Sequence, residues 1–205
     1  MLIREIKQTT PERLTLIFDD GRQLRTTLGF VMSRSISSGM ELDEAEYEAL
    51  VNASSLSLAK SRALKLVGAR AMSAKQLHDK LIEKGESPEN AEKCVEWLTE
   101  YGYINDAEFA AMIVRHYAAK GYGKARVKQE LCKHGIENGL WDKALEEMPA
   151  QDDKLLEFLR ARLSDPTDRA EVKRVSDALY RRGYSWNEIR HALNSFIAET
   201  EDFYP

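Results

Sequence analysis

The pattern of hydrophobic and polar positions changes once along the chain. In the first 30 residues, apolar side chains alternate with polar ones in two runs, 13–18 and 22–28. Alternation at period two is typical of half-buried β-strands. From about residue 56 onward, apolar positions recur at helical spacing, and Gly, Ser or Pro interrupts them every 10–15 residues. The pattern therefore predicts a small β element followed by a mainly α-helical body.

The β element is predicted to be a hairpin, and the pairing of its strands selects the turn. An Asp-Asp-Gly signal at 19–21 separates the two runs. A two-residue loop would place Leu16 opposite Arg25, whereas a three-residue loop, with its glycine at positive φ, places Leu16 opposite Leu24 on one apolar face. We therefore expect the three-residue loop. Residues 2–7 are expected to add a third strand, because two strands alone are marginally stable.

The segment between the hairpin and the helical body is predicted to hold a linker and one short helix. Residues 29–39 begin and end with glycine and contain four serines, which indicates a linker. Asp43 is expected to cap a helix that runs to about Ala53, with glutamates near its start that complement the helix dipole. A separate helix is expected over 56–71. Residues 1–55 would then form an N-terminal extension.

The helical body repeats itself around three glycines. Gly85, Gly135 and Gly183 stand 50 and 48 residues apart. Apolar residues occupy the positions four and eight residues before each glycine and six, ten and thirteen residues after it. Each glycine is expected to end a helix in the left-handed conformation, with lysine or arginine in the turn before it. A new helix then starts at Ser87 and at Ser185, while Glu137 is the weaker cap of the middle repeat.

One further helix precedes each of these pairs. The later two are expected over 107–120, with Asp106 as the N-cap, and over 152–163. The predicted fold is mainly α, with three tandem three-helix repeats in an elongated curved array that share a continuous core. The expected domains are 1–55, 56–104, 105–150 and 151–200.

Composition favours a soluble protein of the reducing cytoplasm. The 205 residues carry a net charge of −4 and only two cysteines, Cys94 and Cys132. Two cysteines in helical contexts do not make a disulfide framework. The sequence holds no apolar run of the roughly 18–20 residues that span a bilayer, and its first residues do not resemble a signal peptide. We therefore expect a cytoplasmic protein without a membrane partner, and a stacked array of this kind is expected to fold as a monomer.

A search for catalytic chemistry gives no candidate. The chain lacks the Gly-x-Ser-x-Gly and His-Glu-x-x-His motifs, and Cys132 and His134 have no partner pair for zinc. The Gly-Tyr-Gly at 121–123 resembles the start of a dinucleotide loop, but Arg126 stands where the third glycine should be. A helix end followed by a turn explains this segment better. We expect no catalytic residue, no metal and no cofactor.

The clearest functional signal is a basic cluster. Residues 111–136 contain six Lys or Arg and one acid, in a chain that is acidic overall. Lys124 and Lys128 are helical neighbours whose repulsion does not favour folding, so an anion-binding face and a solvated face both fit. Tyr122 and Tyr184 lie beside basic residues; either ring can stack on bases, although packing against the next helix is favoured for Tyr184. The candidate partner-binding or nucleic-acid-binding residues are Arg115, Lys120, Tyr122, Lys124, Arg126, Lys128, Arg181 and Arg182.

The repeats resemble those of the RecX family, which comprises bacterial regulators of the RecA recombinase. The resemblance covers roughly residues 58–198. Its most specific part lies in the middle repeat: Tyr103-Ile104-Asn105-Asp106, Phe109-Ala110, Arg115, Lys120-Gly121-Tyr122-Gly123, Arg126-Val127, Glu130-Leu131 and Gly135-Ile136. The first and third repeats match more loosely, through Ser73, Gln76-Leu77, Lys80-Leu81, Gly85, Arg181-Arg182-Gly183-Tyr184-Ser185, Ile189 and Leu193.

The resemblance implies a non-enzymatic protein that binds RecA, especially its filament on single-stranded DNA. Proteins of this family lodge in the groove of the filament and inhibit strand exchange, ATP hydrolysis and co-protease activity. The implied partners are the RecA filament and single- or double-stranded DNA. The family resemblance does not extend to residues 1–55.

A direct DNA-binding module of helix-turn-helix type is the alternative, because two helices in each repeat meet at a short glycine turn. The second helix of the first pair is, however, rich in glutamate, whereas a major-groove helix should begin with Arg, Lys or Asn. A scaffold that binds neither DNA nor a recombinase is a third possibility.

Overall fold

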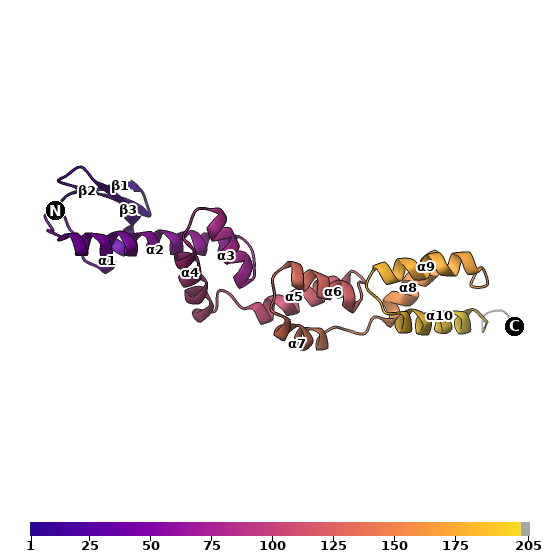
Figure 1. The fold of residues 1–205 in the computed structure, drawn as a ribbon. Coiled ribbons are helices and arrows are strands. Elements are labelled where there is room, and N and C mark those ends of the chain that lie inside the picture. The colour runs from indigo at the N-terminus through magenta and orange to yellow at the C-terminus, as the bar shows by residue number, and fades with distance from the viewer. Residues whose placement is uncertain (202–205) are drawn as a thin grey trace. The chain divides into compact units, whose positions relative to one another are not determined.

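The protein is described by a computed structural model in which residues 1–201 are placed (Figure 1). This part of the chain contains three β-strands, ten α-helices and one short 3-10 helix. The whole chain divides into two compact units, Met1–Ile104 and Asn105–Pro205. None of the helices in the described residues combines the length and the apolar content needed to cross a lipid bilayer.

The first unit begins with an antiparallel sheet of three strands in the order β1, β2, β3. The strands are β1 (Ile3–Thr10), β2 (Arg13–Phe18) and β3 (Gln23–Thr27). Leu16 pairs with Leu24, and Gly21 has a φ of 87° in the loop between the strands. The predicted register and the three-residue loop are therefore confirmed. The apolar face of the sheet packs onto Val31, Ile36, Leu42 and Leu50 in a core of its own.

Two of the predictions for residues 29–71 are wrong. The expected linker begins with a helix, α1 (Leu28–Ser33), whose first turn is capped by the Thr27 hydroxyl. The two helices expected on either side of residue 55 are one 26-residue helix, α2 (Glu44–Ala69). Residues 52–55 contain no glycine or proline, so the backbone continues through the expected break, and Ser54 is completely buried. Asp43 caps this helix as predicted, in a capping box with Glu46.

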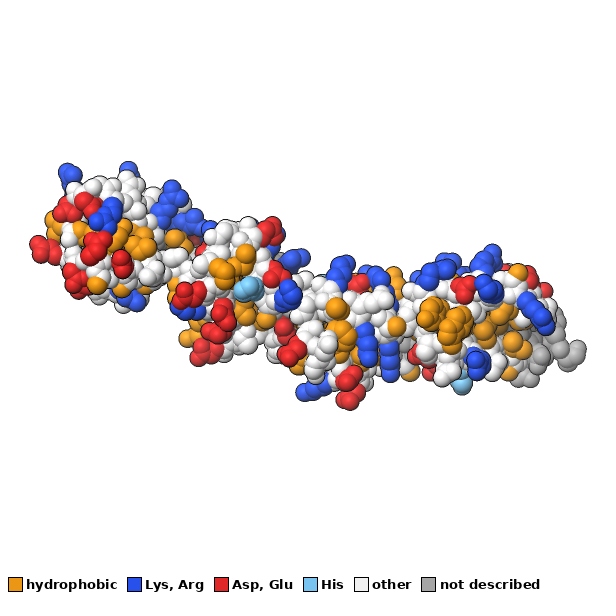
Figure 2. All heavy atoms as spheres, in the orientation of Figure 1, with side chains coloured by type: hydrophobic (Ala, Val, Ile, Leu, Met, Phe, Trp, Pro, Cys, Tyr) orange, Lys and Arg blue, Asp and Glu red, His pale blue; other side chains and the backbone are white. Residues whose placement is uncertain are grey.

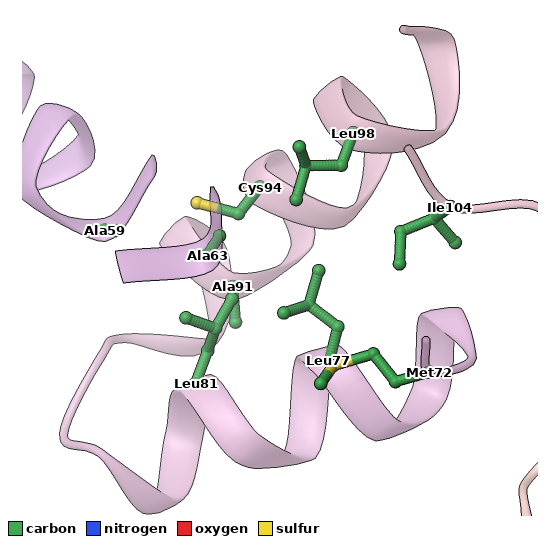
Figure 3. Packing of buried hydrophobic residues seen from close by; sticks show 9 residues of the cluster. All are labelled: Ala59, Ala63, Met72, Leu77, Leu81, Ala91, Cys94, Leu98 and Ile104. Carbon is green, nitrogen blue, oxygen red and sulfur yellow. The ribbon is translucent and has the colours of Figure 1, made fainter. Parts of the chain in front are cut away.

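The second half of α2 forms a three-helix group with α3 (Ala74–Glu83) and α4 (Pro88–Glu100). Figure 3 shows Leu77 and Leu81 from α3 pointing toward Ala91, Cys94 and Leu98 from α4. Ala59 and Ala63 are the α2 residues of this core. Small residues on α2 allow the other two helices to approach its backbone closely. Gly85, between α3 and α4, has a φ of 87°, as expected for a helix-ending glycine.

The second unit contains two more three-helix groups. The first consists of α5 (Asp106–Ala119), α6 (Lys124–Lys133) and a third segment formed by a 3-10 turn (Asn138–Leu140) and α7 (Trp141–Glu146). The N-cap of α5 is Asn105 and not Asp106 as predicted, because the Asn105 side chain accepts a hydrogen bond from the backbone of Glu108. Glu137 makes no capping hydrogen bond with its side chain, consistent with the short, irregular helix that follows it.

The last group consists of α8 (Asp152–Arg162), α9 (Arg169–Arg181) and α10 (Trp186–Glu201). Its core contains Leu155 and Leu159 from α8, Leu179 from α9 and Ile189 from α10. Each three-helix group has a separate hydrophobic cluster built from the periodic apolar positions. The prediction that the repeats share a continuous core is therefore wrong, because the apolar positions of each repeat pack against one another. The predicted mainly α fold, with three three-helix repeats after a three-stranded β element, is confirmed.

Candidate functional site

The eight candidate residues all belong to the second unit, and most of them lie on or next to α6 or at the end of α9. Arg115 lies on α5, and Lys120 and Tyr122 follow its end. Lys124, Arg126 and Lys128 lie on α6. Arg181 is the last residue of α9, and Arg182 is its C-cap. Figure 2 shows Lys and Arg side chains, in blue, gathered over α6 and α9.

The start of α6 is joined to the end of α9 through the backbone. The Gly123 N–H donates to the Arg182 carbonyl at 3.0 Å, and the Ala125 N–H donates to the Gly183 carbonyl at 3.1 Å. Gly123 has no side chain to cap α6, so the carbonyls that end α9 satisfy amide groups at the start of α6. The negative end of one helix dipole meets the positive end of another, which is also favourable. We call this contact the glycine junction, formed by residues 123–125 and 182–183.

The glycine junction requires the absence of two side chains. A Cβ on Gly123 would lie 2.3 Å from the Gly183 carbonyl oxygen, and a Cβ on Gly183 would lie 2.3 Å from the Arg126 nitrogen. Gly121 has a φ of 71° and follows the end of α5, which confirms the predicted helix end and turn for the Gly-Tyr-Gly segment. The role of Gly123 was missed. A glycine at an N-cap position, where a serine or asparagine is expected, was the only signal in the sequence.

Arg182 is held in the glycine junction. Its guanidinium group lies 5.3 Å from the ring centroid of Tyr122 and 4.9 Å from that of Phe158, and it donates to the Gly121 carbonyl at 3.2 Å. Cation–π contacts and a hydrogen bond therefore use both the charge and the donors of this side chain within the fold. Tyr122 is half-buried and has Arg126 at 6.0 Å on its ring as well. Arg182 and Tyr122 therefore contribute to the contact between the second and third repeats.

Arg126 neutralises a buried carboxylate. The side chain of Glu130 is only 4% exposed, and the Arg126 guanidinium lies 2.8 Å from it. Lys133 approaches the same carboxylate to 3.9 Å. Burial, and then the hydrogen bond to Glu130, raise the pKa of the nearby Tyr117 hydroxyl. A buried carboxylate without a partner is strongly unfavourable, so the ion pair with Arg126 is needed to keep Glu130 buried.

Exposed, unpaired cations remain in the cluster. Lys124 and Lys128 are exposed and make no ion pair within the described residues, and we call these two residues the lysine face of α6. Lys120 is exposed, and its ammonium group lies 5.9 Å from the centroid of the Tyr117 ring. Arg181 is exposed and also unpaired in the described part of the chain, whereas Arg115 faces Glu147 at 3.4 Å. The contacts thus distinguish the cations that pair with groups of the same chain from those that do not.

Of the aromatic side chains around Gly183, one is buried and two are exposed to solvent. Tyr184 is buried, with its pKa raised to about 12 by desolvation, which agrees with the packing role favoured from sequence. Tyr180 and Trp186 are 54% and 50% exposed, and their rings stack on each other. Sequence reasoning missed this pair, because it forms across the turn between two helices.

Metal ligands do not gather in the described residues: no three His, Cys, Asp or Glu side chains are placed to hold an ion. Cys94 is buried and Cys132 is exposed. Desolvation raises the pKa of the Cys94 thiol to about 11, as expected for a cysteine that serves as a small apolar core residue.

Comparison with known proteins assigns the family. Residues 59–98 match the model of the first three-helix domain of RecX, and residues 105–145 match the model of its second three-helix domain. A regulatory protein RecX from Xanthomonas axonopodis pv. citri is 35% identical over 134 residues, which cover 64% of this chain and 83% of that protein. The chain belongs to the RecX family.

Other RecX proteins are similar over nearly the whole chain, so the expectation that the similarity excludes residues 1–55 is wrong. The regulatory protein RecX of Clostridium acetobutylicum is 24% identical over 204 residues, or 95% of each protein. A crystal structure of a regulatory protein RecX superposes with a TM-score of 0.76 at 22% identity, and covers 94% of this chain and 98% of its own. RecX from Lactobacillus salivarius superposes with a TM-score of 0.63 at 21% identity over 70% of this chain. These two structures support the fold, and the named relatives are regulatory proteins.

Proposed function

We propose that the protein binds the RecA recombinase and its filament on single-stranded DNA, and that it lowers strand exchange, ATP hydrolysis and co-protease activity. It would act in the cytoplasm without catalysis of its own, in homologous recombination, DNA repair and the SOS response. Membership of the RecX family supports this proposal through the activity that the resemblance implies. The three separately packed helical repeats fit a protein that grips a large partner.

The observation that carries the proposal is the lysine face of α6. Lys124 and Lys128 are exposed, carry like charges one turn apart, and have no ion-pair partner within the described residues. Like charges at this spacing destabilise a helix by about 0.2–0.5 kcal/mol. The chain as a whole has a net charge of −4. An uncompensated positive face on such a chain favours the binding of an anionic surface. The phosphates of single-stranded DNA would supply such a surface in the filament.

The glycine junction strengthens the argument, because it combines charges from two repeats. Lys124 follows Gly123, and Arg181 precedes Arg182, so these cations flank the hydrogen bond between Gly123 and Arg182. The two side chains are 57 positions apart in sequence but belong to neighbouring ends of α6 and α9. A partner that carries an extended row of negative charge would meet both repeats at once.

The proposal is tested by a titration of this protein into RecA on single-stranded DNA, with ATP hydrolysis and strand exchange as the measurements. We expect both rates to fall as the protein is added. Unchanged rates at saturating protein would contradict the proposal. Duplex DNA without RecA serves as a control for the helix-turn-helix alternative: sequence-dependent retardation of the duplex in a gel would favour that alternative instead.

A further inference from the structure

Two aromatic rings form an exposed stack on the third repeat. Tyr180 lies in the last turn of α9, and Trp186 is the first residue of α10. The centroids of their rings are 5.1 Å apart and their planes are inclined by 16°. Tyr180 is 54% exposed and Trp186 is 50% exposed. A nearly parallel pair with this much open surface resembles one step of a base stack.

The core of the repeat does not need either ring. Its apolar cluster is built from Leu179, Tyr184 and Ile189 together with residues of α8, and neither Tyr180 nor Trp186 belongs to it. Tyr184, the other aromatic residue near the turn, is buried. Exposed aromatic surface that does not contribute to the core is typical of an interaction site.

Two exposed cations lie beside the stack. Arg181 follows Tyr180 in sequence, and Arg190 lies one helical turn after Trp186; both are exposed and make no ion pair within residues 1–201. Of the nearby acids, Asp177 faces Lys173 at 3.4 Å. Glu188 keeps its negative charge, and its carboxylate is held at the helix start, where it accepts a hydrogen bond from the Ser185 backbone at 2.7 Å.

We propose that Tyr180 and Trp186 are a stacking platform for the bases of a single-stranded nucleic acid, with Arg181 and Arg190 placed for its phosphates. Aromatic platforms with adjacent cations are the common device for binding single strands, because every base has a π face. Bases of a duplex are stacked on each other and do not offer that face. The inference deepens the proposed function, on which it rests, since the strand would be that of the filament.

The test measures binding to nucleic acid without RecA. Fluorescence anisotropy of a labelled oligothymidine of about 20 nucleotides reports the affinity of the full chain, and a matched abasic oligonucleotide keeps the phosphates but removes the bases. We expect the wild-type protein to prefer the oligothymidine. The Tyr180→Ala/Trp186→Ala variant should bind it about 5- to 150-fold more weakly, and should bind the two oligonucleotides equally.

Matched controls separate stacking from loss of folding. Tyr101 and Tyr103, in the first unit, are 67% and 62% exposed, and the Tyr101→Ala/Tyr103→Ala variant should bind like the wild type. Circular dichroism establishes that the platform variant is folded, and Trp186→Phe should retain most of the binding because it keeps a ring. Equal affinity of the wild type for the oligothymidine and the abasic strand would overturn the inference.

Inhibition of RecA, measured in parallel, distinguishes this inference from the proposed function. A wild-type protein that inhibits RecA but shows no base-dependent binding overturns the platform and leaves the proposed function intact. A platform variant that loses inhibition but binds the oligothymidine normally would show that the rings contact protein, which also overturns it. Base-dependent binding through the platform, without any effect on RecA, would support the inference and contradict the proposed function.

Discussion

Substitution of Gly123 by alanine is predicted to uncouple the second repeat from the third. Gly123 has a φ of −79° and a ψ of 170°, which any residue adopts, so the change causes no local backbone strain. A Cβ at this position would, however, lie 2.3 Å from the Gly183 oxygen, 2.4 Å from the Gly183 carbonyl carbon and 2.6 Å from the Tyr184 nitrogen. All three atoms belong to the backbone, so the two chain segments must separate.

The energetic effect follows from the contacts that separation breaks. Two backbone hydrogen bonds cross the glycine junction, and each contributes about 0.5–1.5 kcal/mol. Arg182 also contacts the ring of Tyr122 across the junction, at about 0.5–1 kcal/mol for a partly exposed cation–π contact. Loss of the set would cost about 1.5–4 kcal/mol, a large part of the about 5–15 kcal/mol that stabilises a typical domain.

Hydrogen exchange and chemical denaturation measure this effect. The Ala125 amide, which donates across the junction, should exchange at least about tenfold faster in Gly123→Ala, and the unfolding midpoint of the second unit should fall. Gly85→Ala is the matched control, because Gly85 ends a helix with a φ of 87° but has nothing within 4 Å of its added Cβ. The free energy of unfolding of this control should fall by only about 1–2 kcal/mol, because alanine is strained in the left-handed conformation. Unchanged exchange at Ala125 in Gly123→Ala would refute the reasoning.

Three further predictions follow from local environments. Cys132 should react with a thiol reagent in the folded protein and Cys94 only after unfolding, because Cys94 is buried and its thiol pKa is raised to about 11; equal rates would contradict this burial. The folded pKa of Tyr184 is raised from 10 to about 12, so the stability due to its neutral hydroxyl is complete below pH 10 and is lost as the pH rises toward 12. Tyr184→Phe should remove that part of the alkaline loss in denaturation measured across this range, and an identical pH profile would count against it. Asp43→Ala should lower the free energy of unfolding by about 1 kcal/mol because it removes a capping box from α2; a change below the error of urea titration would contradict this.

Short-range patterns predicted most of the fold. The hairpin register follows from alternation at period two and one glycine, and the repeats follow from three glycines with apolar residues at fixed offsets. The prediction failed at α2, because no residue near Ser54 distinguishes a break from a continuous helix. Only packing of both halves of α2 against separate cores determines that the helix continues.

The candidate site was predicted as a set of charges, but their roles depend on distant residues. Arg182 contacts Gly121 from 61 positions away, and Arg126 is committed to Glu130 because the fold buries that carboxylate. The spacing of residues along one helix predicts neither the contact of Arg182 with Gly121 nor the burial of Glu130. The stacked pair of Tyr180 and Trp186 was missed because the Gly183 turn brings the two helix ends together.

Co-sedimentation with RecA filaments on single-stranded DNA tests the central claim most directly. The wild-type protein should pellet with the filaments, and Lys124→Glu/Lys128→Glu should remain largely in the supernatant. The matched control is Lys84→Glu/Lys143→Glu, which changes two other exposed lysines that lack ion pairs within the described residues. It changes the net charge by the same amount and should pellet like the wild type. A wild-type protein that stays in the supernatant, or two variants that pellet equally, would contradict filament binding through the lysine face.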